Sequence, residues 1–578
     1  MTLSSFDIFD TTLIRKCGKP ENVVYSLARK LYPKDFRKQD EFTLWRNRVP
    51  KEIAKNGEYT LEDVYSSNGV EAFTEYTISE LKKLEMSVEE ELLFGNPAIL
   101  QKIRECRAQG DQIVFISDMH LPVDFLRKIL KREDAYKEGD GLYVSNDKKA
   151  RKDKGTLYDL VRNDYHPKKW IHYGDNTLSD FRIPRKKSIK TILINEDYNE
   201  TELELVNKSP LLQFPSELSM LAGISRAARR KFGNMTETML AADFVAPAFI
   251  PFVMHVLEDA KKRGLKTLYF ISRDGFIFQK IAEKMPHEGV NFRYLFASRK
   301  SLQGAFFHIA TDEELIVTKL KEKKKFNHNY TDEYEICCGY LLQEGVFSDN
   351  IGLVDLGWFG STRLMINSIR KKNGKKPLMC YYYGEDPYMI SSFYGEFDVF
   401  CTVPLVSEWQ CLVMEEYYCA CPWSTTLSYK KEGDKYVPVF GKEISYNEDV
   451  SVKTNVAVCE YIVPLVLQYG FHLESLYEWM SISLKSLMTG DFFVDWTILS
   501  NRYQGNEFQI RKLSLQETIS YMLNRKKPNV TNIKASLDLT WGYTIRRRLL
   551  CINKITGLLL TYMASAKSKL CFLKLINR

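Results

Sequence analysis

The sequence predicts an α/β fold with two Rossmann-like domains, followed by a mainly helical C-terminal region. Three observations support this prediction. Short apolar runs of strand length alternate with amphipathic helical stretches, which is typical of βαβ units around a parallel sheet. Several of these runs end in polar residues, as expected where a sheet binds a ligand. The chain has 578 residues, more than one hydrophobic core usually organises, so two or three domains are expected.

The first domain is expected over residues 1–200. Its apolar runs are bounded by turn residues and by helical stretches. The predicted strands cover residues 3–10, 113–116, 142–144, 170–173 and 191–194. Helices are predicted over residues 98–109, 123–132 and 155–163, and a mostly helical insertion, about residues 15–95, separates the first strand from the second. This alternation predicts a parallel sheet with helices on its faces.

A second Rossmann-like α/β domain is predicted over residues 201–400. A long helix over 242–263 precedes strands at 267–271, 294–296 and 351–354. Residues 401–578 form a third, mixed and mainly helical region, with helix near 459–489. Its tail, residues 539–578, contains no acidic residue and is both basic and apolar. Such a tail either lies on an anionic membrane surface or docks as a helix on another domain.

Composition narrows the class of protein and its compartment. The net charge is +8, but 82 basic and 74 acidic residues are spread widely, so no nucleic-acid partner is expected. The N-terminus lacks a signal-peptide pattern, and no uninterrupted apolar run reaches membrane-spanning length. The 12 cysteines show no zinc-ligand spacing. We therefore expect a cytoplasmic protein, with peripheral attachment to the inner face of the membrane, or to glycan-assembly proteins, as a further expectation for the basic tail.

The first domain carries polar side chains directly after three predicted strands. Asp7, Ser117 and Asp175 follow these strands, and parallel strands end at one edge of a sheet, so the three side chains are expected to converge. A carboxylate that attacks a phosphate forms an acyl-phosphate and splits hydrolysis into two easier steps. Because two anions must meet, such a site needs a divalent cation and fixed positive charge. Mg²⁺ prefers oxygen ligands, which these residues supply.

Each candidate residue has an expected role. Asp7 is the expected nucleophile and also a metal ligand, and Ser117 would donate a hydrogen bond to the phosphoryl oxygens. A lysine would neutralise developing charge; Lys152 is preferred from the Lys-x-x-Gly pattern, with Lys149 and Lys154 as alternatives. Asp10 is the nucleophile in an alternative register. The expected metal ligands are Asp7, Asp175, Asn176 and Asp180, with Mg²⁺ as the cofactor.

The order of these motifs resembles the haloacid dehalogenase-like hydrolase superfamily over residues 1–200. The resemblance rests on Phe6–Thr11, Phe115–Met119, Lys152–Gly155 and Gly174–Asp180. It implies that the helical insertion is a cap that excludes water and selects the substrate, with Arg46, Arg48 and Glu52 as polar candidates or as surface charge. Phosphatases of the superfamily usually carry a second aspartate two residues after the nucleophile, where this chain has Phe9. Loss of a general acid costs about 10²–10⁴ in rate, which predicts slow or narrow activity.

A second set of polar residues follows the strands predicted in the second domain. Glycines there would let backbone N–H groups approach an anion, and arginines would bind a phosphate or carboxylate bidentately. The alternative is a set of structural turns with internal ion pairs. The candidate substrate- or anion-binding residues are Arg273, Asp274, Arg299, Asp355, Gly357, Gly360, Ser361 and Thr362.

Both sets together resemble large predicted hydrolases that accompany bacterial surface-polysaccharide biosynthesis. The resemblance extends to about residue 430 and implies a phosphorylated sugar, nucleotide sugar or glycan precursor as substrate. We therefore expect a Mg²⁺-dependent phosphohydrolase with a small phosphorylated substrate. Two alternatives stay open: a glycosyl- or phosphoribosyl-type transferase with its main site in the second domain, and a non-catalytic binding protein in which the first site has decayed.

Overall fold

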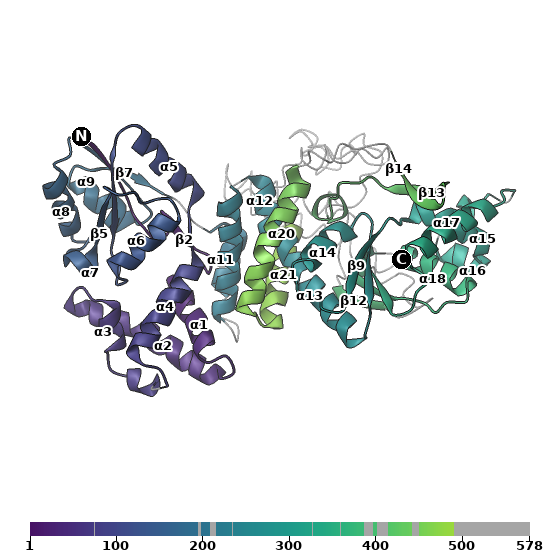
Figure 1. Ribbon diagram of the computed structural model, residues 1–578, viewed down its shortest axis with the longest axis horizontal. Coiled ribbons are helices and arrows are strands. Elements are labelled where there is room, and N and C mark those ends of the chain that lie inside the picture. Colours follow the sequence, from purple (N-terminus) through teal and green to yellow (C-terminus); the bar gives the residue numbers. More distant parts are fainter. Residues whose placement is uncertain are drawn as a thin grey trace, which may run out of the picture. The chain divides into compact units, whose positions relative to one another are not determined.

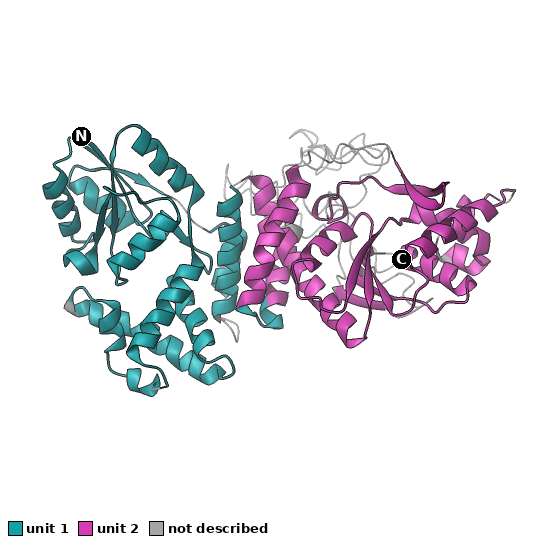
Figure 2. Ribbon diagram, viewed as in Figure 1, with its two compact units in different colours: residues 1–234, 469–475 teal, residues 235–468, 476–578 magenta. Residues whose placement is uncertain are grey.

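The computed structural model divides the chain into two compact units (Figure 2). One contains residues 1–234 and 469–475, and the other contains residues 235–468 and 476–578. The residues whose structure is described are 1–73, 75–194, 198–208, 215–233, 235–318, 320–325, 327–358, 360–385, 397–401, 414–441 and 450–489. The predicted basic tail, residues 539–578, lies outside them.

The first unit extends past the predicted boundary at residue 200. Helices α10 (Glu200–Lys208) and α11 (Pro215–Phe232) pack against each other within it. A buried ion pair joins them, with Arg229 Nη2 2.7 Å from a carboxylate oxygen of Glu202. Helix α11 also packs on the first helix of the chain, α1 (Pro20–Leu31). These contacts explain why the division falls near residue 234.

A five-stranded parallel sheet forms the core of the first unit (Figure 1). Its order is β5-β4-β1-β6-β7. The chain adds β4 and β5 on one side of β1 and then β6 and β7 on the other side. The strands are β1 (Thr2–Phe6), β4 (Gln112–Ser117), β5 (Gly141–Val144), β6 (Lys169–Gly174) and β7 (Lys190–Leu193). All five were predicted, although β1 ends at Phe6 rather than residue 10. The carboxyl end of β1, between β4 and β6, is the point where ligands bind on such sheets.

Apolar residues cover both faces of this sheet, as in other parallel α/β sheets. On one face the rings of Phe6 and Tyr173 stack with their centroids 4.7 Å apart. On the other face Leu3, Val114 and Trp170 join one buried cluster. The flanking helices are α5 (Pro97–Ala108), α6 (Val123–Arg132), α7 (Ser145–Lys148), α8 (Thr156–Tyr165) and α9 (Ile183–Lys186).

The insertion between β1 and β4 is a helical cap. A short antiparallel pair that was not predicted, β2 (Leu13–Arg15) with β3 (Leu93–Gly95), joins it to the sheet domain. Its helices are α1, α2 (Phe36–Ile53), α3 (Leu61–Tyr65) and α4 (Ile78–Leu92). Threonines begin α3 and α4 with capping boxes, in which side chain and backbone satisfy each other's hydrogen bonds.

The second unit contains another five-stranded parallel sheet, in the order β12-β11-β10-β8-β9. The strands are β8 (Thr267–Ile271), β9 (Asn291–Leu295), β10 (Ile351–Trp358), β11 (Met379–Glu385) and β12 (Phe397–Cys401). Counted along the chain, this is order 2-1-3-4-5, in which the strand order reverses between β8 and β10. The sequence did not predict β11 and β12. The third strand was predicted to end at residue 354, whereas β10 continues through Asp355 to Trp358.

Helices cover both faces of the second sheet (Figure 1). Phe249 of α13 (Ala246–Lys262) packs edge-to-face on Phe278 of α14 (Gly275–Ala282) and on Tyr383 of β11. Helices α15 (Arg299–Ile309), α17 (Thr331–Gln343) and α18 (Ser361–Lys372) form the opposite layer. Two parallel sheets with flanking helices confirm the predicted α/β class.

The described residues after 400 contain both strands and helices. A hairpin, β13 (Thr426–Glu432) with β14 (Lys435–Phe440), precedes α20 (Val450–Tyr469) and α21 (Leu473–Thr489). By length and composition alone, two helical stretches could cross a membrane, whereas none was expected from the sequence. They are Thr236–Lys262, which is mostly buried within the protein, and Val450–Tyr469, which is half buried.

Candidate active site

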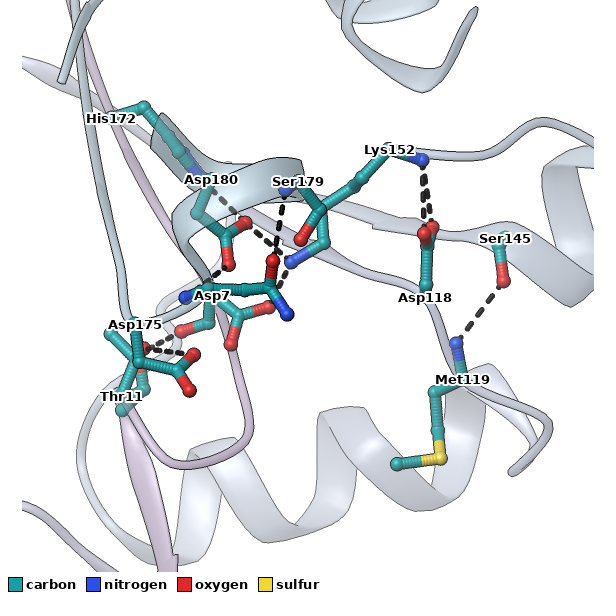
Figure 3. Close-up of polar contacts among 12 residues, drawn as sticks. Asp7, Thr11, Asp118, Met119, Ser145, Lys152, His172, Asp175, Ser179 and Asp180 are labelled. Carbon is teal, nitrogen blue, oxygen red and sulfur yellow. Dashed lines mark hydrogen bonds and ion pairs between the residues drawn. The ribbon is translucent and has the colours of Figure 1, made fainter. Parts of the chain in front are cut away.

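Three carboxylates meet at the carboxyl ends of β1 and β6 (Figure 3). Asp7 is the first residue after β1, Asp175 the first after β6, and Asp180 lies in the helical turn that follows. One carboxylate oxygen from each lies within 4.8 Å of the others. Lys152 contacts Asp7, and its Nζ lies 2.6 Å from Asp180 Oδ1. The structure therefore brings together four of the residues predicted for this site.

Backbone and threonine contacts fix Asp7 in this position. Its N–H donates to Tyr173 O at 2.8 Å, which ties the end of β1 to β6. Thr12 Oγ1 donates to the carbonyl oxygen of Asp7 at 2.6 Å, and Thr11 Oγ1 donates to Asp175 Oδ1 at 3.3 Å. The opening turn thus aims Asp7 at the cluster and also steadies its neighbour Asp175.

A buried network that the sequence did not predict holds Asp180. His172 Nε2 lies 3.1 Å from Asp180 Oδ1, and His172 Nδ1 lies 2.8 Å from Ser5 Oγ. The Tyr158 hydroxyl donates to the Ser179 carbonyl oxygen at 2.8 Å and lies 3.0 Å from His172 Nε2. Nothing in the sequence marked His172, because it sits inside a predicted strand. The contact with His172 keeps the Asp180 carboxylate turned toward Lys152.

Gly174 is required for the close approach of Asp180. A Cβ atom at residue 174 would lie 2.5 Å from the Cβ of Asp180, nearer than such atoms approach in proteins. The Gly-Asp pair at the end of β6 therefore has two separate functions. The glycine makes room for one carboxylate, and Asp175 supplies another.

Asp10 lies outside the cluster. Its backbone is left-handed, with φ of 53°, and Arg226 Nη2 and Arg15 Nη1 lie 3.1 and 3.7 Å from its carboxylate. Phe9, where the superfamily carries an acid, packs its ring 4.3 Å from the Arg15 guanidinium carbon and is 8% exposed. These contacts hold Asp10 away from the carboxylate cluster that contains Asp7, and position 9 carries no proton donor.

The other predicted residues of this site take varied positions. Ser117 is the last residue of β4 and is buried. Asn176 caps the following helical turn, since its Oδ1 accepts from Leu178 N at 2.9 Å and Ser179 N at 3.0 Å. Lys149 and Lys154 are exposed. Of the three candidate lysines, Lys152 is therefore the one that contacts the carboxylates.

Asp118 holds the loop that carries Lys152, a role that the sequence did not predict (Figure 3). Both of its carboxylate oxygens accept from the backbone N–H of Lys152, at 2.8 and 3.1 Å. Because Asp118 directly follows Ser117, the β4 end positions the lysine as well as the serine. The bond spans 34 residues of chain, so it becomes visible only in the fold.

Charge in the cluster is unbalanced. Burial, together with Asp180 and Asp175, raises the pKa of Asp7 well above its usual range despite the nearby Lys152. Burial and the neighbouring Asp10 and Asp180 raise the pKa of Asp175 to about 6. Although burial opposes it, Lys152 and His172 lower the pKa of Asp180, and despite burial Asp7 and Asp180 raise the pKa of Lys152. The single positive charge of Lys152 is therefore too small to balance three ionised carboxylates.

The polar cap residues separate into two groups. Arg46 is buried and pairs with Glu85, with Nε 2.9 Å from Oε2, so it stabilises the cap interior. Arg48 and Glu52 form an exposed pair at 3.5 Å along one helix. Neither arrangement places these three residues in the carboxylate cluster.

In the second unit, glycines and capping contacts account for several predicted residues. Gly357 has φ of 110°, and a Cβ there would meet Gly384 O at 2.1 Å, so it permits close pairing of β10 and β11. Gly360 is the left-handed residue that begins α18, whose first two residues are Ser361 and Thr362. Ser298 caps α15, which starts at the exposed Arg299.

Charged groups also gather at the ends of β8 and β10. Burial and Glu415 raise the pKa of Asp355 to about 7, opposed by the Leu356 N–H and Arg299. The Arg273 carbonyl accepts a hydrogen bond from the Tyr294 hydroxyl at 3.4 Å. Arg273 and Asp274 both interact with the Cys421 thiol, whose pKa is raised to about 11, chiefly by burial. The sequence had not marked Glu415 or Cys421, which reach this edge from a distant segment.

No family model matches this chain, and no curated protein matches it either. Two solved structures are similar in fold, "Crystal Structure analysis of a Dehalogenase" and "Crystal Structure analysis of a Dehalogenase with intermediate complex". Both are 16% identical, and they cover 34% of this chain and 87% and 86% of their own, with TM-scores of 0.26 and 0.25.

Proposed function

We propose that the first unit is a Mg²⁺-dependent phosphohydrolase that acts through an aspartyl-phosphate at Asp7. The observation that carries this proposal is the convergence of Asp7, Asp175 and Asp180 around Lys152 at the carboxyl end of β1. Nucleophilic carboxylate chemistry on a phosphate needs this combination of an aimed carboxylate, hard oxygen ligands and a fixed cation.

The donor set fits a divalent cation. Asp7, Asp175 and Asp180 would hold it, since their oxygens lie within 4.8 Å of one another and Mg²⁺ prefers carboxylate oxygens and water. Burial, and to a lesser degree the neighbouring carboxylates, raises the pKa of Asp7 and of Asp175, and a divalent cation would favour their ionised forms. When bound, Mg²⁺ would withdraw charge from the phosphoryl oxygens and from the attacking carboxylate.

Side chains of this protein would carry out the nucleophilic attack and stabilise the charge on the phosphoryl group. Asp7 attacks phosphorus, the bond from phosphorus to the leaving oxygen breaks, and that oxygen takes a proton from solvent water. A second water then attacks the phosphorus of the acyl-phosphate, gives its proton to solvent, and releases phosphate and the Asp7 carboxylate. Lys152 fixes the Asp7 carboxylate and balances charge on the phosphoryl oxygens, to which Ser117 would donate its hydroxyl proton in a hydrogen bond. Because Phe9 supplies no proton, we expect slow turnover of substrates whose leaving group needs protonation.

The substrate and setting of this proposal come from the sequence. We propose a phosphorylated sugar or glycan precursor as the substrate and cytoplasmic polysaccharide assembly as the context. The resemblance of both motif sets to predicted polysaccharide-associated hydrolases supports these two points. Attachment through the basic tail, residues 539–578, stays a prediction.

Phosphate release tests the proposal. Purified wild-type protein should release phosphate from p-nitrophenyl phosphate and from sugar phosphates with added Mg²⁺, and EDTA should stop the release. Asp7→Asn should abolish it, because the carboxamide is no nucleophile. Asp10→Asn is the matched control and should retain activity, since Asp10 is held by Arg15 and Arg226.

Two results would contradict this assignment. Full activity of Asp7→Asn together with loss in Asp10→Asn would move the nucleophile to Asp10. A folded, Mg²⁺-loaded protein without turnover on a broad panel of phosphate esters would favour the non-catalytic alternative, in which Phe9 marks a decayed site.

A second candidate function lies in the second unit, where we propose a site for a phosphorylated sugar or nucleotide of a transferase. The strand order supports it, because β8 and β10 flank the reversal point, Arg273 and Asp274 follow β8, and Asp355 lies in the second half of β10. Calorimetric titration with UDP and with ribose 5-phosphate should detect binding that Arg273→Ala removes and Asp7→Asn preserves. Equal binding by Arg273→Ala, or loss in Arg293→Ala at exposed β9, would reject this site.

A further inference from the structure

We infer that the cap residues Glu58 and Tyr59 select the leaving group of the substrate, and that this group is a neutral polyol such as the sugar of a sugar phosphate. The inference rests on the phosphohydrolase proposed for the first unit. It goes beyond that proposal by assigning residues that no sequence motif marked and by narrowing the substrate class.

The cap loop before α3 contacts the core loop that follows Ser117. Leu61 N donates to His120 O at 3.0 Å. The rings of Tyr59 and His120 stack with centroids 5.5 Å apart and planes 17° apart. From the cap interior, Arg46 Nη2 reaches His120 Nε2 at 3.1 Å. The cap is thus seated on the end of β4, beside the predicted phosphoryl-binding serine.

Glu58 reaches the second core loop of the site. Its Oε1 lies 3.4 Å from Arg151 Nε, and Arg151 immediately precedes Lys152. The Glu58 and Arg151 side chains keep 14% and 34% exposure, so solvent reaches this contact. Tyr59, Asp118 and His120 are also half-buried rather than enclosed. The cap and core thus meet through partly accessible polar side chains, not through a sealed apolar seam.

The core residues in this contact flank catalytic candidates. Asp118 follows Ser117, Arg151 precedes Lys152, and Asp118 accepts the Lys152 N–H with both carboxylate oxygens. Glu58 is also close enough to help raise the pKa of Asp118, after the larger effect of burial. A substrate whose phosphoryl group sits between Ser117 and Lys152 therefore brings its leaving group within reach of Glu58 and Tyr59.

The chemistry of these groups fits hydroxyls better than charge. Each carboxylate has about four acceptor positions, so Glu58 and Asp118 keep free lone pairs beside their present partners. Together they would repel a leaving group that carries phosphate or carboxylate. Arg151 donates to Asp153 through Nε and Nη2 at 2.8 and 3.0 Å, so Nη1 is the nitrogen that would donate to a hydroxyl oxygen. The Tyr59 ring offers an amphipathic surface to a sugar ring. A neutral polyhydroxylated group satisfies all of these side chains, whereas a nucleoside diphosphate does not.

The cap provides its own control. Glu52 is a carboxylate on the same cap, paired with Arg48 at 3.5 Å on an exposed helix face. Its side chain is 57% exposed. Removing the charge of Glu52 therefore changes cap charge by the same amount as at Glu58, away from the contact with the core.

Substrate selectivity tests the inference. kcat/KM is measured with Mg²⁺ on glucose 6-phosphate, ribose 5-phosphate, AMP and p-nitrophenyl phosphate for wild type, Glu58→Gln, Tyr59→Leu and Glu52→Gln. Glu58→Gln should lower kcat/KM on the two sugar phosphates about tenfold, mainly through KM, because hydroxyl bonds to a charged acceptor weaken. p-Nitrophenyl phosphate has no hydroxyl and should change less than about threefold. Tyr59→Leu should shift the same ratio, and Glu52→Gln should match wild type.

Each contrary result has a distinct meaning. Equal losses on sugar and aryl phosphates would overturn the inference, because Glu58 would then only latch the cap. Unchanged ratios in both Glu58→Gln and Tyr59→Leu, or wild-type preference for AMP over the sugar phosphates, would overturn it as well, while hydrolysis itself stands. Absence of hydrolysis in wild type on every substrate would instead remove the proposed function and this inference with it.

Discussion

The two parallel sheets of this protein use polar residues at their strand ends in different ways. In the first unit these side chains turn toward one another: Asp7, Asp175 and Asp180 share one lysine. In the second unit many of them serve the backbone instead. Ser298 caps a helix, Gly357 allows two strands to approach, and Ser272 Oγ donates to Ala297 O at 3.1 Å. Similar sequence patterns can therefore build either a cluster of charged side chains or a well-formed sheet edge.

The buried side chains of the two units also differ, with ion pairs in the first unit and aromatic rings in the second. The first unit buries ion pairs, among them Arg15 with Glu89 and Arg46 with Glu85. The described core of the second unit is rich in aromatic rings, such as the Phe249–Phe278 pair with centroids 4.8 Å apart. Buried ion pairs respond to pH and to loss of one partner, whereas ring packing responds to volume. The comparison predicts that each unit will be sensitive to a different kind of substitution.

Arg46→Met gives the largest expected change in stability. The substitution leaves the Glu85 carboxylate buried without its guanidinium, and loss of one partner from a buried pair costs about 3–5 kcal/mol. Urea unfolding followed by tryptophan fluorescence should show the first unit, which holds Trp45, unfolding at lower urea. Arg48→Met is the control, because its exposed pair is worth at most about 1 kcal/mol. Equal midpoints for both variants would show that the buried pair contributes no more than a surface pair.

The same pair predicts acid sensitivity of the first unit. Although burial opposes it, Arg46 and His120 lower the pKa of Glu85 to about 2 in the folded protein, from an ordinary value of 4.5. A lowered folded pKa means that the stabilisation is complete above about pH 4.5 and is lost as pH falls toward 2. The loss is about 3 kcal/mol, since one pKa unit is about 1.4 kcal/mol. Glu85→Gln should flatten this limb of the stability curve; an unchanged slope would contradict the pairing.

Local pattern was enough to predict much of the first sheet and its site. β1 and β6 are compact apolar runs, and Asp7 and Asp175 follow them directly, so chain order alone predicted that these two carboxylates would converge. Contacts between residues far apart in the sequence could not be predicted. Lys152 meets Asp7 across 145 residues and Asp118 holds Lys152 across 34, and neither contact has a local signature.

Other elements and contacts were not predicted from the sequence, each for its own physical reason. β2 and β3 have three residues each, too short for a periodic pattern, and are stabilised only by pairing across the cap. The β13–β14 hairpin turns at Gly433 and Asp434, with Gly433 at φ of 60°, a turn signal that was present but overlooked. His172 is polar in a strand because Ser5 and Asp180 satisfy both ring nitrogens, which only the fold reveals.

Gly357→Ala tests packing in the second unit. Its φ of 110° disfavours a side chain, and the new Cβ would lie 2.1 Å from Gly384 O on β11. Overpacking costs about 1–3 kcal/mol and a left-handed residue about 1–2 kcal/mol more. Gly374→Ala has φ of 71° with no atom within 4 Å, so it isolates the backbone cost. Calorimetry should show a larger fall in Tm for the first variant, and equal shifts would mean that β10 relaxes away from β11.

Asp355→Asn should act in the opposite direction and stabilise the second unit. Burial and Glu415 raise the folded pKa of Asp355 to about 7, so its carboxyl group reduces stability as pH rises from about 4 to 7. The carboxamide keeps an acceptor for Leu356 N–H, now 2.9 Å from Asp355 Oδ1, and cannot ionise. Thermal unfolding should show a higher stability than wild type at pH 8, with little change at pH 4. Destabilisation at pH 8 would mean that Asp355 is ionised and paired with Arg299, which would make this strand end resemble the charged cluster of the first unit.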